Sequence, residues 1–255
     1  MTLLCLKRSR GLNHKLEQEA FEQQKKSDLR ITDLVNRVDS LGRELNKAQV
    51  ENVWHLSYAA NYKDNATGHH LWRMSAYSTL LAELINLDSR EVELISKSSP
   101  LHDIGKIGIP GEILSKPGPL TPDERLVMEK HTLIGGSILG TGNSDYMNTG
   151  TLIALTHHER WDGKGYPYGL KEDDIPIAGR ICAVADSFDA LTSKRPYKAA
   201  YPVDRAVDII ISGRETCFDP GLVDIFVSNL ESMLDIKDNL LEDPYEGLVV
   251  CCEQP

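Results

Sequence analysis

Apolar residues return every three or four positions through most of the chain after residue 50, which is the period of one face of an α-helix. The segments with this pattern are 73–87, 89–105, 121–139, 147–159, 178–193, 203–212 and 220–234. The strict alternation of a half-buried strand is not found, although residues 180–186 (RICAVAD) also fit a buried strand. The sequence therefore predicts an all-α fold.

Two of these segments begin with residues that cap helices. Thr121 precedes Pro122 and stands three positions before Glu124, which is the arrangement of a capping box with proline at the first helical position. Ser89 is the expected cap of segment 89–105. Pro100 lies near the end of that segment, where the loss of a backbone donor is expected to kink the helix.

The composition indicates a protein with a sizeable core, since 41% of the 255 residues are hydrophobic and the mean hydropathy is -0.31. The net charge of -10 argues against binding a nucleic-acid polymer. No apolar run approaches the roughly 20 residues of a membrane helix, and the first ten residues lack the order of a signal peptide. Scattered cysteines are typical of a reducing compartment: Cys5, Cys182, Cys217, Cys251 and Cys252. We therefore expect a cytoplasmic protein that does not bind a membrane.

The N-terminal region carries a short heptad pattern. Apolar residues alternate at spacings of three and four, and Ala48 continues the pattern: Ile31, Leu34, Val38, Leu41 and Leu45. We call these five residues the seam. Such a seam predicts a coiled coil that joins two copies of the chain; the alternative is a single amphipathic helix packed on its own domain. The expected division is a coiled-coil helix over 1–49, a catalytic domain over 50–236 and an acidic tail over 237–255.

Paired side chains at two places suggest metal chemistry. His102 and Asp103 are neighbours, as are His157 and His158, and both pairs are expected on helices. Neighbours on a helix diverge by about 100° and cannot chelate one ion together, but they can hold two adjacent ions with the carboxylate between them. Two such ions can clamp an in-line displacement at phosphorus. Lone histidines such as His14, His55 and His69 are expected to be surface or hydrogen-bonded residues.

Five motifs in this order closely resemble the HD-GYP family, a branch of the HD metal-dependent phosphohydrolases. They are TGHHLWR (67–73), LHDIGKIGIP (101–110), KHTLIGGSIL (130–139), HHERWDGKGYPYGL (157–170) and RICAVADSFDALTSKRPYK (180–198). The resemblance covers about residues 50 to 235. It implies an all-helical HD-type domain, preceded here by the coiled-coil helix, that hydrolyses the bacterial second messenger cyclic di-GMP, with linear pGpG or GMP as the product.

The resemblance also implies the site residues. The metal ligands it implies are His70, His102, Asp103, His131, His157, His158 and Asp186. They are expected to hold two divalent transition-metal ions, iron or manganese, with zinc, nickel or cobalt as other candidates. Lys106 matches the lysine that assists the leaving group, so Lys106 and Asp103 are the expected catalytic residues.

Three further residues are implied as substrate contacts. Arg195 and Lys198 match residues that hold substrate phosphate, and the alternative is a solvated charged turn. Tyr166 belongs to the GYP signature, with packing alone as the alternative. Asp189, one turn beyond Asp186, either orients ligands or is a surface charge.

Two departures from the family pattern keep a second function open. Ala66 stands where some members have a glutamate that binds a third ion, so two ions are expected. Pro100 replaces a small or apolar residue just before His102. The alternative function is a weakly active or inactive cyclic-dinucleotide sensor and scaffold. Hydrolysis of a different nucleotide is a third option. A homodimer through the N-terminal helix is expected, as is an upstream sensory or response-regulator partner.

Overall fold

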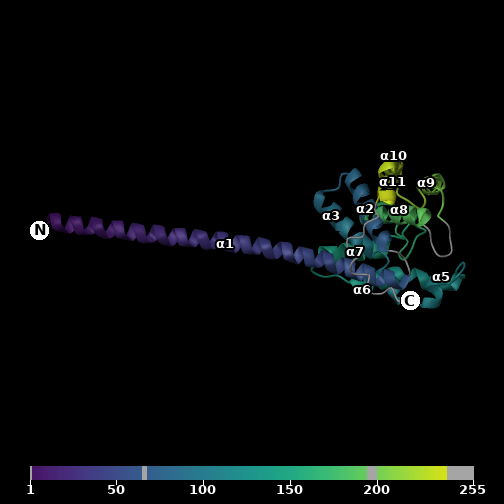
Figure 1. Cartoon of the computed structure of the whole chain (residues 1–255), viewed down its shortest axis with the longest axis horizontal. Helices are drawn as coiled ribbons and strands as arrows, with labels where there is room; N and C mark the ends of the chain where they lie inside the picture. The colour runs from purple at the N-terminus through teal and green to yellow at the C-terminus, as the bar shows by residue number, and fades with distance from the viewer. Residues whose placement is uncertain (1, 65–67, 194–199, 240–255) are drawn as a thin grey trace. The chain divides into compact units, whose positions relative to one another are not determined.

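The computed structural model describes residues 2–64, 68–193 and 200–239, and this part of the chain is helical (Figure 1). Outside the helices it contains one isolated bridge, between Arg214 and Phe218. Residues 180–186 lie inside a long helix, so their interpretation as a strand is wrong. The predicted all-α fold is confirmed.

Helix α1 runs from Thr2 to Asp64 without a break. Backbone contacts divide the chain into two units, Met1–Ala48 and Gln49–Pro255. In the first unit the seam residues are 54–65% exposed, which leaves an apolar stripe open to a partner. Among the described residues, no helix combines the length and the apolar character that a membrane crossing requires. Dimerisation through the seam stays a prediction.

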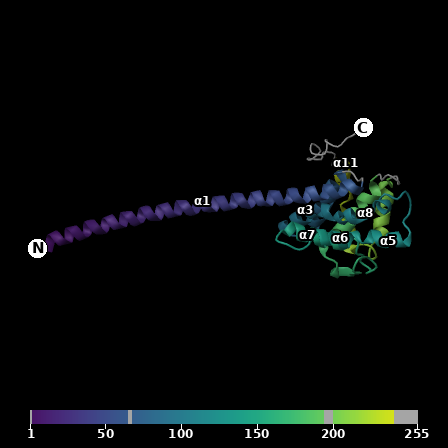
Figure 2. The ribbon, with the colours of Figure 1, turned by 90° about the horizontal axis from the view of Figure 1, so that it is seen from below.

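The second unit contains the end of α1 and the remaining helices (Figures 1 and 2). The α-helices are α2 (Gly68–Leu84), α3 (Ser89–Ser98), α4 (Gly111–Leu114), α5 (Pro122–Glu129), α6 (His131–Leu139), α7 (Asp145–Thr156), α8 (Ile177–Thr192), α9 (Val203–Ser212), α10 (Pro220–Ser228) and α11 (Leu230–Asn239). Three short 3-10 helices are η1 (Ser99–Leu101), η2 (Ile104–Gly108) and η3 (Glu172–Asp174).

The main core of this unit forms where α2, α8 and α10 pack together. Three fully buried aromatic side chains connect them. The Tyr77 ring lies edge-on to Phe188 at 5.5 Å between centroids, and Phe188 meets Phe226 at 5.0 Å. Cys182 of α8 is a free, buried thiol in the same cluster. Because α2 and α8 carry His70 and Asp186, this core fixes the two helices that present them.

Several predicted helix boundaries needed correction. The cap of α3 is Asp88, whose carboxylate accepts the backbone N–H of Arg90 and Glu91, so Ser89 is the first helical residue. The capping box at Thr121 is confirmed, but segment 121–139 divides into α5 and α6 at Lys130. Segment 220–234 likewise divides, into α10 and α11. Periodicity does not show such breaks because the apolar face continues across them.

Candidate metal centre

His102 and Asp103 lie in a turn between two short 3-10 helices. Helix α3 ends at Ser98, and Pro100 is the second residue of η1. His102 ends η1, and Asp103 precedes η2. The expectation that both residues lie on one α-helix is therefore wrong. Proline ends α3 here rather than kinking it, because its missing N–H is not needed in the first turn of a new helix.

His157 and His158 also lie just beyond a helix rather than within it. His157 is the C-cap of α7, and its backbone N–H donates to Ile153 O. His158 follows in the turn, so the prediction that this pair lies inside a helix is wrong as well. Past a helix end the backbone can turn, and both imidazoles can face the same space. Their ring centroids are 4.0 Å apart.

The structure brings most of the predicted ligands into two groups that share one residue. The first group is Asp103, His131, His157 and His158; the second is His70, His102 and Asp103. Within each group the ligand atoms lie within 4.8 Å of one another. Asp186 lies outside both groups, with its Oδ1 3.9 Å from His102 Nε2.

The two carboxylate oxygens of Asp103 face different neighbours. Oδ1 lies 3.5 Å from His131 Nε2 and 3.9 Å from His157 Nε2, whereas Oδ2 lies 3.2 Å from His102 Nε2. A carboxylate placed in this way can ligate one ion with each oxygen. The geometry fits two neighbouring ions joined by Asp103.

Backbone carbonyls select the nitrogen that each imidazole presents. The Nδ1 atoms of His102, His131 and His157 lie 2.8, 2.7 and 3.0 Å from the carbonyl oxygens of Ser99, Met128 and Ile153. A carbonyl only accepts, so each Nδ1 carries the hydrogen and donates it. The other nitrogen, Nε2, is therefore the one that can ligate a metal, which is the usual arrangement for a ligating histidine.

Two observations show that these nitrogens fit a cation. His131 Nε2 and His157 Nε2 lie 3.4 Å apart, so two lone pairs face each other unless a cation lies between them. His102 Nε2 is buried and has no hydrogen-bond partner. Buried polar atoms are normally satisfied, and one ion in each ligand group would satisfy these nitrogens.

The electrostatic balance of the cluster also favours a bound cation. Burial, reinforced by neighbouring imidazoles, lowers the pKa of His157 to about 3 and lowers the pKa of His131 and His158, so these rings are neutral ligands at neutral pH. Burial opposes the charge of Asp103, but Lys106 and His102 outweigh burial and hold the pKa of that carboxyl well below its usual range. At His102 burial is likewise outweighed: Asp103 and Asp186 raise its pKa to about 9, so this imidazole must release its Nε2 proton when it ligates an ion.

Asp189 holds His70 from outside the ligand groups. Its Oδ2 lies 2.8 Å from His70 Nδ1, and Arg73 Nε donates to its Oδ1. Burial opposes its charge, but His70 and Arg73 lower the pKa of Asp189 to about 2. Of the two alternatives for Asp189, orientation of a ligand matches this contact, and a surface charge does not, because the residue is buried.

Substitution of Asp189 by asparagine is expected to weaken the binding of one ion about 10–100-fold, the usual effect of losing the partner of a ligating histidine. The amide keeps the size of the side chain but loses the charge that pairs with Arg73 and polarises His70. Competitive metal titration measures the change. Asp208→Asn, at an exposed position of α9, is the matched control, and equal affinities in the two variants would contradict the prediction.

The GYP segment closes over His158. The Tyr166 ring lies 4.8 Å from the His158 ring and 6.3 Å from the His131 ring. Glu159, which the sequence analysis did not single out, is buried and accepts the backbone N–H of Tyr168 and Leu170 at 2.7 and 3.0 Å. The sequence does not reveal that Glu159 holds this loop, because its partners are backbone N–H groups, which almost every residue type supplies.

Lys106 lies beside the shared carboxylate, with Nζ 2.7 Å from Asp103 Oδ2. The two residues are three positions apart, and Lys106 lies within the 3-10 helix η2. Arg195, Lys198 and Ala66 lie outside the described residues. The segment with Arg195 and Lys198 begins just after Ser193, whose Oγ accepts a hydrogen bond from Arg73 Nη2 at 3.0 Å.

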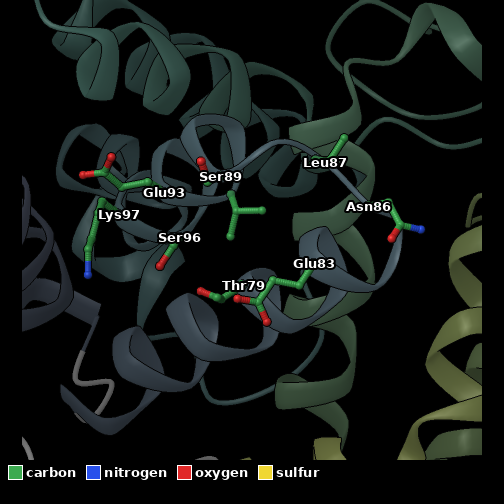
Figure 3. A pocket seen from close by; sticks show the side chains of 9 residues that line it. Thr79, Glu83, Asn86, Leu87, Ser89, Glu93, Ser96 and Lys97 are labelled. Atoms are coloured by element: carbon green, nitrogen blue, oxygen red, sulfur yellow. The ribbon is translucent and has the colours of Figure 1, made fainter.

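A separate hollow of about 670 Å³ lies between α2 and α3 (Figure 3). Thr79 and Glu83 of α2 face Ser96 and Lys97 of α3 across it. The hollow is lined by none of the residues in the two ligand groups. It has no part in the metal centre.

A family model described as HD domain matches residues 49–222. The chain belongs to the HD domain family. The match covers the second unit from the last turns of α1 to α10 and includes all seven predicted ligands. Members of this family bind divalent metal ions, and the two groups around Asp103 are where such ions fit in the described part of the chain.

Curated relatives share this HD domain over most of the chain. The chain is 44% identical over 195 residues to the cyclic di-GMP phosphodiesterase response regulator RpfG of Xanthomonas campestris, covering 76% of this chain and 52% of that protein. It is 47% identical over 181 residues to a cyclic di-GMP phosphodiesterase of Thermotoga maritima, covering 71% and 49%. A 3'3'-cGAMP-specific phosphodiesterase 2 of Vibrio cholerae is 39% identical, with 77% and 38% covered. The chain spans about half the length of the first two relatives.

The fold of the HD domain has also been seen in a solved structure. A cyclic GMP-AMP specific phosphodiesterase of V. cholerae (V-cGAP3) superposes with a TM-score of 0.53 at 17% identity. The match covers 74% of this chain and 50% of that chain. At this identity the similarity shows a common fold.

Proposed function

We propose that this chain hydrolyses a phosphodiester bond of cyclic di-GMP, as an HD-GYP type phosphodiesterase. The observation that carries the proposal is the pair of ligand groups that share Asp103. Two bound ions at such a site polarise a phosphodiester and supply an activated water for attack at phosphorus. The five HD-GYP motifs and the names of relatives that share 44% and 47% of matched residues support the substrate.

The donor set supports two transition-metal ions. Imidazole and carboxylate ligands suit iron, manganese or zinc better than calcium or magnesium, which prefer oxygen ligands alone. We propose iron or manganese, with zinc, nickel or cobalt fitting the same donors. The two groups supply six ligand residues, and Asp186 is proposed as the seventh because it lies 3.9 Å from His102.

The roles of the other residues follow from their positions. Lys106 carries a proton at Nζ, beside Asp103, and is proposed to donate it to the leaving oxygen of the substrate. Tyr166 lies over the His158 ring and is proposed to contact the substrate. Arg195 and Lys198 are proposed to hold a substrate phosphate, for which arginine is suited by its fork of donors.

A product assay on metal-loaded protein tests this function. Protein reconstituted with iron or manganese under reducing conditions is incubated with cyclic di-GMP, and the nucleotides are separated by chromatography. Linear pGpG, alone or followed by GMP, is the expected product. Intact cyclic di-GMP in the presence of protein with two bound ions would refute the proposal.

A second candidate substrate is the hybrid dinucleotide 3'3'-cGAMP. The observation that favours it is the 39% identity to a 3'3'-cGAMP-specific phosphodiesterase. The same assay run with both dinucleotides distinguishes the two substrates by their relative kcat/KM. Tight binding of either dinucleotide without turnover would favour the sensor alternative.

The N-terminal helix is proposed to join two copies of the chain and to receive a signal from an upstream sensory or response-regulator partner. The exposed seam supports this proposal, as does the description of one relative as a response regulator. We retain the proposed division into 1–49, 50–236 and 237–255; residues 240–255 lie outside the described residues.

The double substitution of Val38 and Leu41 by glutamate is expected to convert the dimer to a monomer. Four like charges would face one another in the paired seam. Each replaced side chain would also lose the free energy of burying an apolar group, which is about 1.5–3 kcal/mol. Sedimentation at micromolar concentration measures the mass. Asn36→Glu, which adds one negative charge on the side of the helix opposite the seam, is the control. A wild-type monomer would contradict the seam as an interface.

A further inference from the structure

The last turn of α1 reaches the backbone that follows Lys106. Lys63 Nζ donates to the carbonyl oxygen of Ile107 at 2.5 Å and to that of Ile109 at 2.7 Å. These contacts join residues 44 and 46 positions apart in the chain. One ammonium group therefore ties the end of α1 to two carbonyls, one and three residues beyond the lysine beside Asp103.

The segment held by Lys63 is the end of η2. The backbone N–H of Lys106 donates to Asp103 O at 2.9 Å, and that of Ile109 donates to Lys106 O at 3.1 Å. Carbonyls at the end of a short helix lack partners within the helix. Lys63 supplies a charged donor for them, and a charge-assisted hydrogen bond is stronger than a neutral one.

Helix α6 holds the same segment independently of Lys63. The Cα of Gly105 lies so close to the His131 carbonyl that an added Cβ would be 1.8 Å from its oxygen. A Cβ on Gly108 would be 2.9 Å from the Ile134 side chain. The backbone around Lys106 is therefore fixed by α6 at its glycines and by α1 at its carbonyls.

The preceding turns of α1 are fixed to the helix that carries His70. Trp54 is 2% exposed and stacks on Trp72 with 3.9 Å between ring centroids. Trp72 Nε1 donates to Tyr58 OH at 2.9 Å. The anchor point of Lys63 is thus itself well defined by packing.

We propose that Lys63 is a positioning residue that holds the Lys106 segment in place, so that Lys106 stays on Asp103 and in reach of the leaving oxygen. The catalytic part of this inference rests on the proposed function. Lys63 touches neither the ligand groups nor the reacting atoms and acts through the backbone of residues 107–109.

The test uses the full-length, metal-loaded chain and a double-mutant cycle. The variants are Lys63→Met, which keeps the aliphatic stem, Lys63→Arg, which keeps a donor for two carbonyls, Lys106→Met, and the combination of Lys63→Met with Lys106→Met. Lys97→Met on α3 is the matched control. For each protein the metal content, kcat, KM and amide hydrogen exchange of the peptide over 104–111 are measured.

Lys63→Met is expected to lower kcat about tenfold and to leave KM and metal content within about twofold, since a misplaced proton donor acts in the transition state. Lys63→Arg is expected to retain most of the wild-type kcat. In the Lys106→Met background, Lys63→Met is expected to change kcat by less than about twofold, because the residue it positions is gone. The 104–111 peptide is expected to exchange at least about fivefold faster in Lys63→Met and unchanged in Lys97→Met.

An equal loss of kcat in both backgrounds, or unchanged exchange of 104–111 in Lys63→Met, would overturn the proposal. Hydrogen exchange does not depend on turnover. Faster exchange in a metal-loaded protein that leaves cyclic di-GMP intact would therefore support the anchor and count only against the proposed function.

Discussion

Substitution of Asp103 by alanine is expected to reduce the bound metal from two ions to fewer than one and to lower phosphodiesterase activity at least about 1,000-fold. Asp103 is the one residue common to both ligand groups, and its two oxygens face different imidazoles. Its removal also takes away the negative charge closest to both His102 and Lys106, so these cationic groups would lose their main partner.

Elemental analysis and the product assay, run on the same preparation, measure both effects. Asp204→Ala, on the exposed first turn of α9, removes an equal charge far along the chain and serves as the control. A substituted protein that keeps two ions, or that keeps its activity after losing them, would place the chemistry elsewhere in the molecule.

Substitution of Gly105 by alanine is expected to lower the free energy of unfolding by about 3 kcal/mol or more, at the upper end of the cost of overpacking. An added Cβ would lie 1.8 Å from His131 O and 2.4 Å from Gly135 N. Both are backbone atoms of α6, so no side chain can rotate away and the helix itself must move. Because η2 carries Lys106 and α6 carries His131, we also expect reduced metal binding.

Urea unfolding with and without metal measures this effect. Gly111→Ala is the matched control, since no atom lies within 4 Å of a Cβ added there. That change is expected to alter the free energy of unfolding by less than about 1 kcal/mol. Equal stabilities of the two variants would show that α6 and η2 are not packed as closely as described.

Local sequence rules predicted the helices well where a capping motif or a clearly bounded apolar face marks their ends. The capping box of Thr121 and Glu124 is present, and α9 has the predicted bounds. The rules were wrong where a helix ends inside a continuous apolar pattern, as at Ser98 and Lys130. Helix ends there depend on tertiary contacts of the turn, which periodicity does not report.

The supporting contacts of the candidate site had no signal in the sequence. Glu159 and Lys63 act on backbone N–H and carbonyl groups, which every residue type supplies. Asp189 reaches His70 across 119 positions. Such partners are chosen by how the helices pack, so their residue types alone do not reveal them.

The helical class follows from the sequence, through the period of its apolar residues, whereas the ligands were implied by the resemblance of five motifs to the HD-GYP family. That His102, Asp103, His157 and His158 lie beyond helix ends, with Asp103 common to two groups, is seen only in the folded structure. The physical reason is that a metal site needs side chains from distant segments to converge in three dimensions. That convergence is produced by the packing of η2 against α6 and of α2 against α8, not by local propensity.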